Sequence, residues 1–282
     1  SVVAGVVVGI AFVRRQHKLE HPLIELQLFR SRTFTAALAV YMLATFAAFG
    51  AFVFIAQYLQ LVLGLSPLKA GLWSLPSFAA FVVGSMIVPM LARRFPPAQQ
   101  ICAGLVIAAV GFAVLTQIDR ANPLAVIVTG SVIYSLGISP VVILATDIIV
   151  GSAPVERAGA ASAISETSSE LGGALGIAIL GSIGTAVYRM RMTEAMPNGV
   201  PVDVGEIARG TLGGATAVAK QLPGQLGDAL LGTARDAFVQ AFVMTAAVNA
   251  VLVLVTAIAA TLMLRRHQAS RESGTSDDVV PS

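Results

Sequence analysis

Long apolar runs alternate with short polar islands along the whole of this chain. Six runs approach the roughly twenty residues that an α-helix needs to cross about 30 Å of hydrocarbon. The first five lie within residues 35–188, and the sixth covers residues 237–264. A soluble core explains one such run but not six. The pattern therefore predicts an all-α polytopic membrane protein with six spans.

The segments outside these runs are shorter or more polar. Residues 1–13 are too short to span and follow no basic region, so we interpret them as the end of a truncated transmembrane helix, in a fragment whose first half is missing. Residues 14–34 form a polar linker. The stretch 189–236 contains two segments with helical patterning, which predict a hairpin of short amphipathic helices or, alternatively, a partly ordered loop. Residues 265–282 are rich in Ser and Asp and predict a disordered tail.

The placement of charge indicates an orientation. Only 12% of the residues are charged, against about 25% in soluble domains. Alternate islands lie on opposite sides of a membrane. One set of islands holds eleven Lys and Arg residues, whereas the other set holds seven, two in its short turns and five in the stretch 189–236. By the positive-inside rule, the linker 14–34 and the tail 265–282 are cytoplasmic, and the stretch 189–236 is extracytoplasmic. The preference for Arg over Lys is typical of a GC-rich bacterial genome. We expect a multi-pass protein of the bacterial plasma (inner) membrane.

Several classes of function have no support in the sequence. There is no basic block with interleaved aromatic residues, so we expect no nucleic-acid partner. Cys102 is the single cysteine, and no HExxH, CxxC or phosphate-loop motif occurs, so we expect no metal, no cofactor and no direct ATP hydrolysis. No nucleophile–base pair is evident. We therefore do not expect an enzyme.

Two acidic residues in the fifth apolar run are the most informative polar feature. Glu166 and Glu170 are four residues apart, so on a helix they share one face. An acid at the centre of a membrane helix costs about 3 kcal/mol and usually faces a bundle interior or an aqueous cavity. Such a carboxylate can carry a proton or attract a cation. The alternative is that both lie near the interface and complement the helix dipole, but a helix starting near Pro154 would place Glu166 about 18 Å along its axis.

Other candidate residues carry weaker signals. Asp147 is the only other acid inside an apolar run and reads as an interface residue, with a proton relay as the alternative. Tyr41, Phe49 and Phe52 follow helical spacing in the first run and would share a stripe. Aromatic faces lining a cavity would suit flat cations through cation–π contact. Contact with lipid or ordinary packing is the alternative.

Glycines follow the two acids closely. Gly172 and Gly176 form a GxxxG pattern, which permits close approach of a second membrane helix. We therefore expect the fifth span to pack tightly on its neighbours. The motif is common in membrane helices and says nothing by itself about chemistry.

Two segments of the sequence resemble a known family. QYLQLVLGLSPLKAGLWSLP and RAGAASAISETSSELGGALGIAILGSIG are similar to the ninth-to-tenth-helix connection and the thirteenth helix of the fourteen-helix drug–proton antiporters of the major facilitator superfamily. The stretch that ends in ARDAFVQAF resembles the extracellular hairpin of that branch. The resemblance implies that the six spans are helices nine to fourteen, and that residues 1–13 end helix eight. It also implies alternating access, with Glu166 and Glu170 at acidic positions that handle substrate or proton.

One departure from that family changes the expected substrate. Some members carry an acid early in the tenth helix, but no acid occurs here between Glu25 and Asp119. This weakens the expectation of doubly charged substrates. Recognition of a cation would then depend more on Glu166, Glu170 and the missing half.

The sequence thus predicts a proton-coupled secondary transporter that exports lipophilic, cationic compounds. Its expected partners are a small-molecule substrate, protons, membrane lipid and the missing N-terminal half of the same transporter. Two alternatives remain open at this point. One is an exporter of an endogenous metabolite, lipid or antibiotic by the same mechanism, and the other is a non-transporting membrane sensor or scaffold.

Overall fold

The structure, a computed structural model, describes residues 28–118 and 122–275, with a few isolated positions before residue 28 and only the backbone for residues 262–275. Within these ranges every regular element is a helix, and six helices are long and apolar enough to cross a membrane. The prediction of an all-α polytopic protein with six spans is therefore confirmed. The predicted truncated helix at 1–13 lies largely outside the described residues, as does most of the linker 14–34.

The long helices follow one another along the chain with short connections. Their bounds are α2 Arg32–Gln57, α3 Pro67–Leu91, α4 Pro97–Leu115, α5 Pro123–Gly151, α6 Ala158–Glu194 and α9 Gly224–Thr275. Shorter elements are η1 Leu28–Arg30, η2 Tyr58–Val62, η3 Val155–Arg157, α7 Val202–Gly210 and α8 Leu212–Ala219.

Proline and serine fix where several helices begin. Pro67, Pro97 and Pro123 are the first residues of α3, α4 and α5. Proline suits this position because the first helical N–H has no partner within the helix and the proline ring already holds a helical φ. Ser66 adds a cap to α3, since its hydroxyl accepts a hydrogen bond from the backbone N–H of Lys69 at 3.4 Å.

The first span ends in a π-helical turn, η2. A π-turn alters the pairing of backbone carbonyls, and here the carbonyl of Leu61 accepts a hydrogen bond from Nε of Arg235 at 3.3 Å. This contact joins the end of the first span to α9. Gly64 then turns the chain toward α3 with φ +68, a left-handed conformation that glycine adopts without steric cost.

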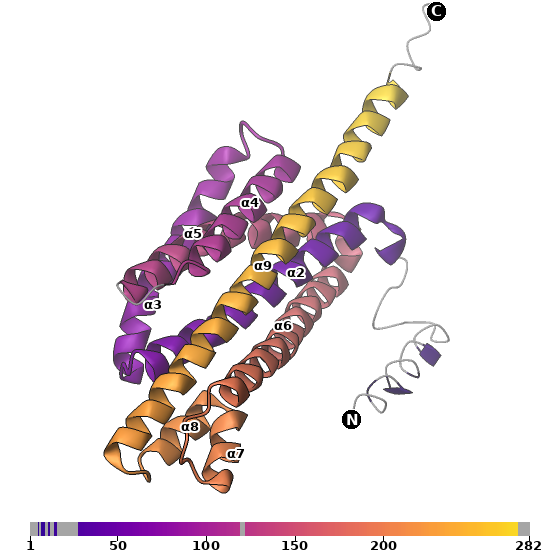
Figure 1. Ribbon diagram of the computed structural model, residues 1–282. Coiled ribbons are helices and arrows are strands. Elements are labelled where there is room, and N and C mark those ends of the chain that lie inside the picture. Colours follow the sequence, from indigo (N-terminus) through magenta and orange to yellow (C-terminus); the bar gives the residue numbers. More distant parts are fainter. Residues whose placement is uncertain are drawn as a thin grey trace, which may run out of the picture.

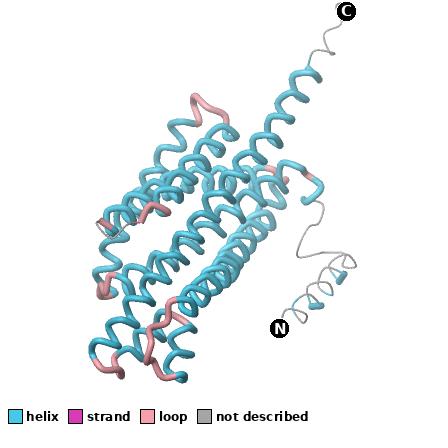
Figure 2. The backbone as a smooth tube through the Cα atoms, viewed as in Figure 1, coloured by secondary structure: helices cyan, strands magenta, loops and turns pink. Residues whose placement is uncertain are grey.

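The six long helices form one bundle (Figure 1). α2 packs against α5, α6 and α9, while α4 lies against α5 and α9. α3 packs mainly along α5, and much of its remaining surface consists of exposed apolar side chains such as Leu72, Val83 and Met86. The short helices α7 and α8 gather at one end of the bundle, called below the α7–α8 end (Figure 1). Loops among the described residues lie at the ends of the helices (Figure 2).

Glycine permits the closest helix contacts. A Cβ at Gly176 would collide with the carbonyl of Phe46, and one at Gly172 would collide with the carbonyl of Met42, so α6 approaches the backbone of α2 directly. The tight packing predicted from the GxxxG pattern is therefore confirmed. α4 and α5 meet in the same way, because a Cβ at Gly137 would collide with backbone atoms of α4.

The stretch 189–236 contains the end of α6, the helices α7 and α8, and the start of α9. The hydroxyl of Tyr188 donates a hydrogen bond to the carbonyl of Ala208 at 2.9 Å, which ties α7 to α6. At its other end α9 continues as a helix to Thr275, so part of the predicted disordered tail 265–282 is helical. The physical reason is that no proline or glycine lies between residues 265 and 273 to end the helix.

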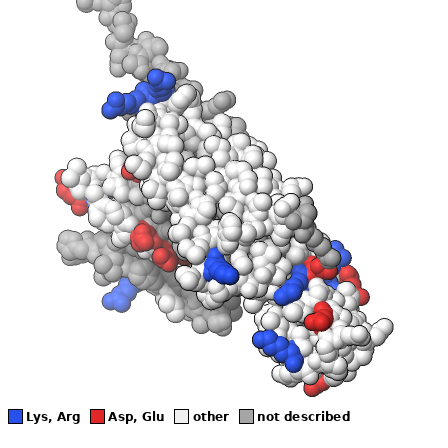
Figure 3. All heavy atoms as spheres, turned by 90° about the vertical axis from the view of Figure 1, so that its left-hand side faces the viewer, with Lys and Arg blue, Asp and Glu red and all other residues white. Residues whose placement is uncertain are grey.

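The surface of the bundle is suited to hydrocarbon. Large apolar side chains are exposed along several of the long helices, an arrangement rare on soluble proteins. In the view of Figure 3, charged side chains gather mainly near the ends and leave broad uncharged areas between them. This distribution fits a helical bundle whose middle lies in lipid.

We predict that the α4–α5 contact does not tolerate a methyl group. Gly137→Ala should lower the free energy of unfolding by about 1–3 kcal/mol, because the new Cβ must push α4 and α5 apart. The loss should appear as a lower thermal unfolding midpoint of the purified protein in detergent. Gly181→Ala is the matched control, since nothing lies within 4 Å of a Cβ built there. Equal midpoints for the two variants would contradict the close packing.

Candidate functional site

A cavity of about 450 Å³ lies between α2, α3 and α5. Its walls are mainly aromatic and aliphatic, and the aromatic lining residues are Phe49, Phe52, Trp73, Phe78, Phe81 and Tyr134. Phe52 and Phe78 meet across it edge to face, with ring centroids 6.3 Å apart. No Asp, Glu, Lys, Arg or His is found among the described residues that line the cavity.

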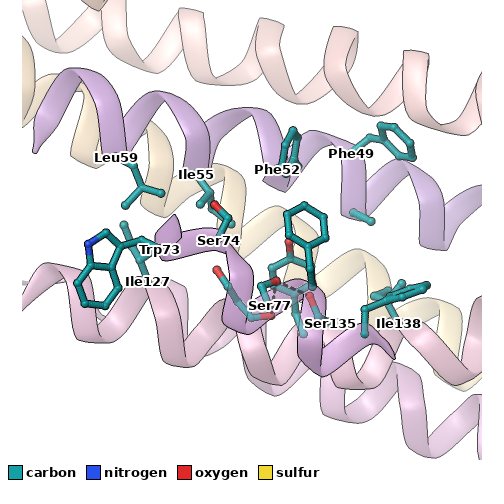
Figure 4. A pocket seen from close by; sticks show the side chains of 15 residues that line it. Phe49, Phe52, Ile55, Leu59, Trp73, Ser74, Ser77, Ile127, Ser135 and Ile138 are labelled. Carbon is teal, nitrogen blue, oxygen red and sulfur yellow. Dashed lines mark hydrogen bonds between the residues drawn. The ribbon is translucent and has the colours of Figure 1, made fainter. Parts of the chain in front are cut away.

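Helical periodicity gathers these side chains from three separate segments. Phe49, Phe52 and Ile55 of α2 and Leu59 of η2 recur every three or four residues and so line one face of the first span. Figure 4 shows this face opposite Ile127, Ser135 and Ile138 of α5, with Trp73, Ser74 and Ser77 supplied by α3. Each helix therefore contributes one stripe of its surface to the cavity.

Hydroxyl groups supply most of the polar part of the lining, from Tyr134 and from four serines: Ser74, Ser77, Ser131 and Ser135. The hydroxyls of Ser77 and Ser135 share a hydrogen bond at 2.7 Å between α3 and α5. Ser77 also lies 3.3 Å from the carbonyl of Ser131, to which its hydroxyl can donate. Ser74 donates to the carbonyl of Ala70 in its own helix at 3.0 Å. The Oγ of Ser131 is buried and has no hydrogen-bond partner.

The structure separates the three aromatic residues that the sequence grouped together. Phe49 and Phe52 line the cavity with about half of each side chain exposed, at 46% and 47%. Tyr41 is not among the residues that line it. It is buried in a smaller cluster with Ala145 and Ile149 of α5, two turns away from Phe49.

Glu166 and Glu170 lie on an exposed face of α6 and do not line the cavity. Among the described residues, neither has a hydrogen-bond or ion-pair partner. Gly173 continues their stripe at helical spacing, and a Cβ there would lie 3.1 Å from Cγ of Phe49. Glu170 is therefore one turn, about 4.5 Å along the axis, from the point where α6 meets a cavity-lining ring.

The start of α6 differs from the expectation. The α-helix begins at Ala158, after the 3₁₀ turn η3, and not near Pro154. Glu166 is consequently about 12 Å along the helix, less than the 18 Å expected from the sequence. The helix dipole acts mainly within the first turn, so it still does not account for Glu166. Asp147 is exposed one turn before the end of α5 and does not line the cavity.

Sequence reasoning missed the serines and Trp73. Ser131 and Ser135 are spaced by four and flank Tyr134, so they lie on one side of α5. That spacing was visible in the sequence, but nothing in it indicated that Ser77 of α3 packs against these serines. Trp73 sits in the first turns of α3, where an aromatic residue also suits a membrane interface.

Comparison with known proteins places the chain among transporters. A family model described as Major Facilitator Superfamily matches residues 1–177. The chain is 38% identical over 262 residues to the multidrug efflux pump LfrA of Mycolicibacterium smegmatis. This match covers 93% of this chain and 52% of that pump. It is 28% identical over 262 residues to the tetracenomycin C resistance and export protein of Streptomyces glaucescens, covering 91% of this chain and 49% of that protein. The chain is 30% identical over 230 residues to the methyl viologen resistance protein SmvA of Salmonella typhimurium. This match covers 81% of this chain and 46% of SmvA. The chain thus spans about half the length of these curated relatives.

We predict that the Ser77–Ser135 hydrogen bond couples α3 to α5. In a double-mutant cycle, Ser77→Ala and Ser135→Ala should show a coupling energy of about 0.6 kcal/mol, typical of hydrogen bonds between membrane helices. Unfolding free energies in mixed micelles would measure it. A cycle that pairs Ser77→Ala with Ser182→Ala, on α6, serves as the control and should give strictly additive effects.

Proposed function

Since the chain belongs to the major facilitator superfamily, we propose that it is the C-terminal half of a fourteen-helix drug–proton antiporter that exports lipophilic, cationic compounds. The chain is a multi-pass protein of a bacterial plasma membrane. The proposal rests chiefly on one arrangement: an aromatic cavity between α2, α3 and α5, with an acidic stripe of α6 starting one turn from its edge. The names of the relatives, which include a multidrug efflux pump, point the same way.

The proposed division into halves is supported by length. The relatives are about twice as long as this chain. In transporters of this kind, substrate binds between two halves related by pseudo-symmetry. We place the six spans as helices nine to fourteen, with the α7–α8 end outside the cell and the opposite end in the cytoplasm.

Transport would then proceed by alternating access. The aromatic cavity holds the apolar body of the substrate, and Trp73, an exposed lining residue, offers its ring to a positive charge. Glu166, exposed on α6 and without a partner among the described residues, exchanges a proton for substrate as the two halves rock. Phe49 contacts α6 at Gly173 and also lines the cavity, so it links the two sites physically.

One observation favours a second candidate function. The cavity lining lacks any acidic or basic side chain among the described residues, which suits an uncharged substrate as well as a cation. Export of an endogenous metabolite, lipid or antibiotic by the same machinery is therefore the alternative. It would appear as a substrate preference unrelated to positive charge.

We predict that Glu166 is needed for proton coupling. In inside-out vesicles with an imposed pH gradient, the intact transporter should accumulate a fluorescent lipophilic cation, and Glu166→Gln should reduce the initial rate at least about tenfold, since loss of a single catalytic proton carrier has effects of this order or larger. The fluorescence is followed at matched expression. Glu156→Gln, in the turn before α6, is the control and should transport normally.

The outcomes of this experiment separate the candidate functions. Accumulation by Glu166→Gln at the native rate would remove Glu166 from the coupling step. No accumulation of any cation by the native transporter, but export of uncharged compounds, would favour the alternative substrate. No gradient-driven movement of either kind would point to a sensor or scaffold.

We also predict that residues 1–282 alone do not transport. With only one half of the pathway, proteoliposomes containing the purified chain should show no gradient-driven uptake above empty liposomes. Uptake is measured with the same fluorescent cation, and proteoliposomes with the intact transporter are the positive control. Uptake by the chain alone would show that the proposed second half is not required.

A further inference from the structure

Ser131 is unusual among the hydroxyl side chains of this bundle. A serine or threonine in a membrane helix commonly donates to a carbonyl one turn earlier, as Ser74, Thr146 and Ser182 do here at 2.7 to 3.0 Å. Ser131 makes no such bond. Its side chain is 5% exposed, and its Oγ is buried without a partner. A hydroxyl in apolar surroundings is costly unless something satisfies it.

The neighbouring hydroxyls do not meet this need. Ser77 and Ser135 are paired with each other at 2.7 Å, and Ser77 approaches the backbone carbonyl of Ser131, not its side chain. Two other buried serines, Ser139 and Ser165, also lack partners, but neither is among the residues that line the cavity. Ser131 alone among the three therefore combines an unsatisfied hydroxyl with a space that a ligand can fill.

The rest of the cavity wall fits a flat apolar ring system. The side chains around Ser131 include Phe52, Phe78 and Tyr134, and the volume of about 450 Å³ falls in the range of small-molecule sites. Tyr134 is itself held in place by stacking on Phe112, with ring centroids 4.9 Å apart and planes within 10°. A rigid aromatic wall of this kind favours planar ligands, because they lose little conformational entropy on binding.

We propose that this cavity binds uncharged planar aromatic compounds that carry an oxygen atom at the ring edge, and that the hydroxyl of Ser131 recognises that oxygen. The inference rests on the second candidate function, export of an uncharged compound by the same machinery, for which it names the substrate class. Ser131 can donate to a carbonyl oxygen or accept from a phenolic hydroxyl, so quinones and phenols both qualify. A dication does not, because no described lining residue offers a charge to offset its desolvation.

The chain offers a local reporter for the test. Trp73 is its single tryptophan and lines the cavity (Figure 4). In the purified intact transporter, with any tryptophan outside residues 1–282 replaced by phenylalanine, Trp73 emission reports ligands that enter this site. The probes are anthraquinone and anthracene, which share three fused rings and differ in two carbonyl oxygens. Anthraquinone should quench Trp73 saturably and bind more tightly than anthracene, and methyl viologen, a planar dication, should not displace it.

The matched variants are Ser131→Ala and Ser139→Ala. Both remove a buried, unpartnered hydroxyl from α5, but only Ser131 lines the cavity. Ser131→Ala should weaken anthraquinone binding about fivefold, the effect of one hydrogen bond, and leave anthracene binding unchanged. Ser139→Ala should change neither. The comparison of the two probes on the native protein needs no variant and stands even if a variant folds poorly.

Several outcomes would overturn the proposal. These are equal affinity of the native protein for anthraquinone and anthracene, an equal loss of both probes in Ser131→Ala, or displacement of anthraquinone by methyl viologen. The failure of the proposed transport function looks different. In that case Trp73 still reports Ser131-dependent anthraquinone binding, but a pH gradient drives no export of anthraquinone or of a lipophilic cation from vesicles.

Discussion

The absence of water from the hydrocarbon layer is the constraint on which this structure depends. A backbone N–H or carbonyl that faces lipid must be paired within its own segment, so each crossing of the membrane is a helix. Helices then cannot rely on the hydrophobic effect to find one another, because lipid is as apolar as their side chains. Close backbone approach takes its place. Gly172 and Gly176 allow α6 to touch the backbone of α2, and Gly137 does the same for α5 against α4.

The same constraint makes each polar side chain within the bundle informative. Most hydroxyls donate a hydrogen bond to a backbone carbonyl one turn earlier in the same helix, as Thr146 does. Such a hydroxyl gives no information about contacts with other helices or with a ligand. Those that do not are either paired between helices, as Ser77 and Ser135 are, or unsatisfied, as Ser131 is. An unsatisfied group beside a cavity indicates where a ligand can replace the missing partner. Elsewhere in the core it is a cost to stability without a chemical consequence.

A structural feature could be predicted from the sequence when the residues that determine it lie close together in the chain. The spans followed from hydrophobic length, which each segment carries by itself. The starts of α3 and α4 at Pro67 and Pro97 are set by chemistry within one turn, but they were not predicted. Phe49 and Phe52 reached one cavity because they are three residues apart on α2. Tyr41 did not, because its neighbours Ala145 and Ile149 on α5 pack over that part of the helix. The hydrogen bond between Ser77 and Ser135 joins residues 58 positions apart, and no local pattern indicates such a pair.

In the proposed transporter, recognition of the substrate body and handling of the proton are assigned to different helices. The cavity belongs to α2, α3 and α5 and contains no acid among its described lining residues, whereas Glu166 and Glu170 belong to α6. Phe49 touches both, since its ring lies against Gly173 and also lines the cavity. A ligand that moves this ring would therefore change the surface that α2 presents to Gly173 of α6.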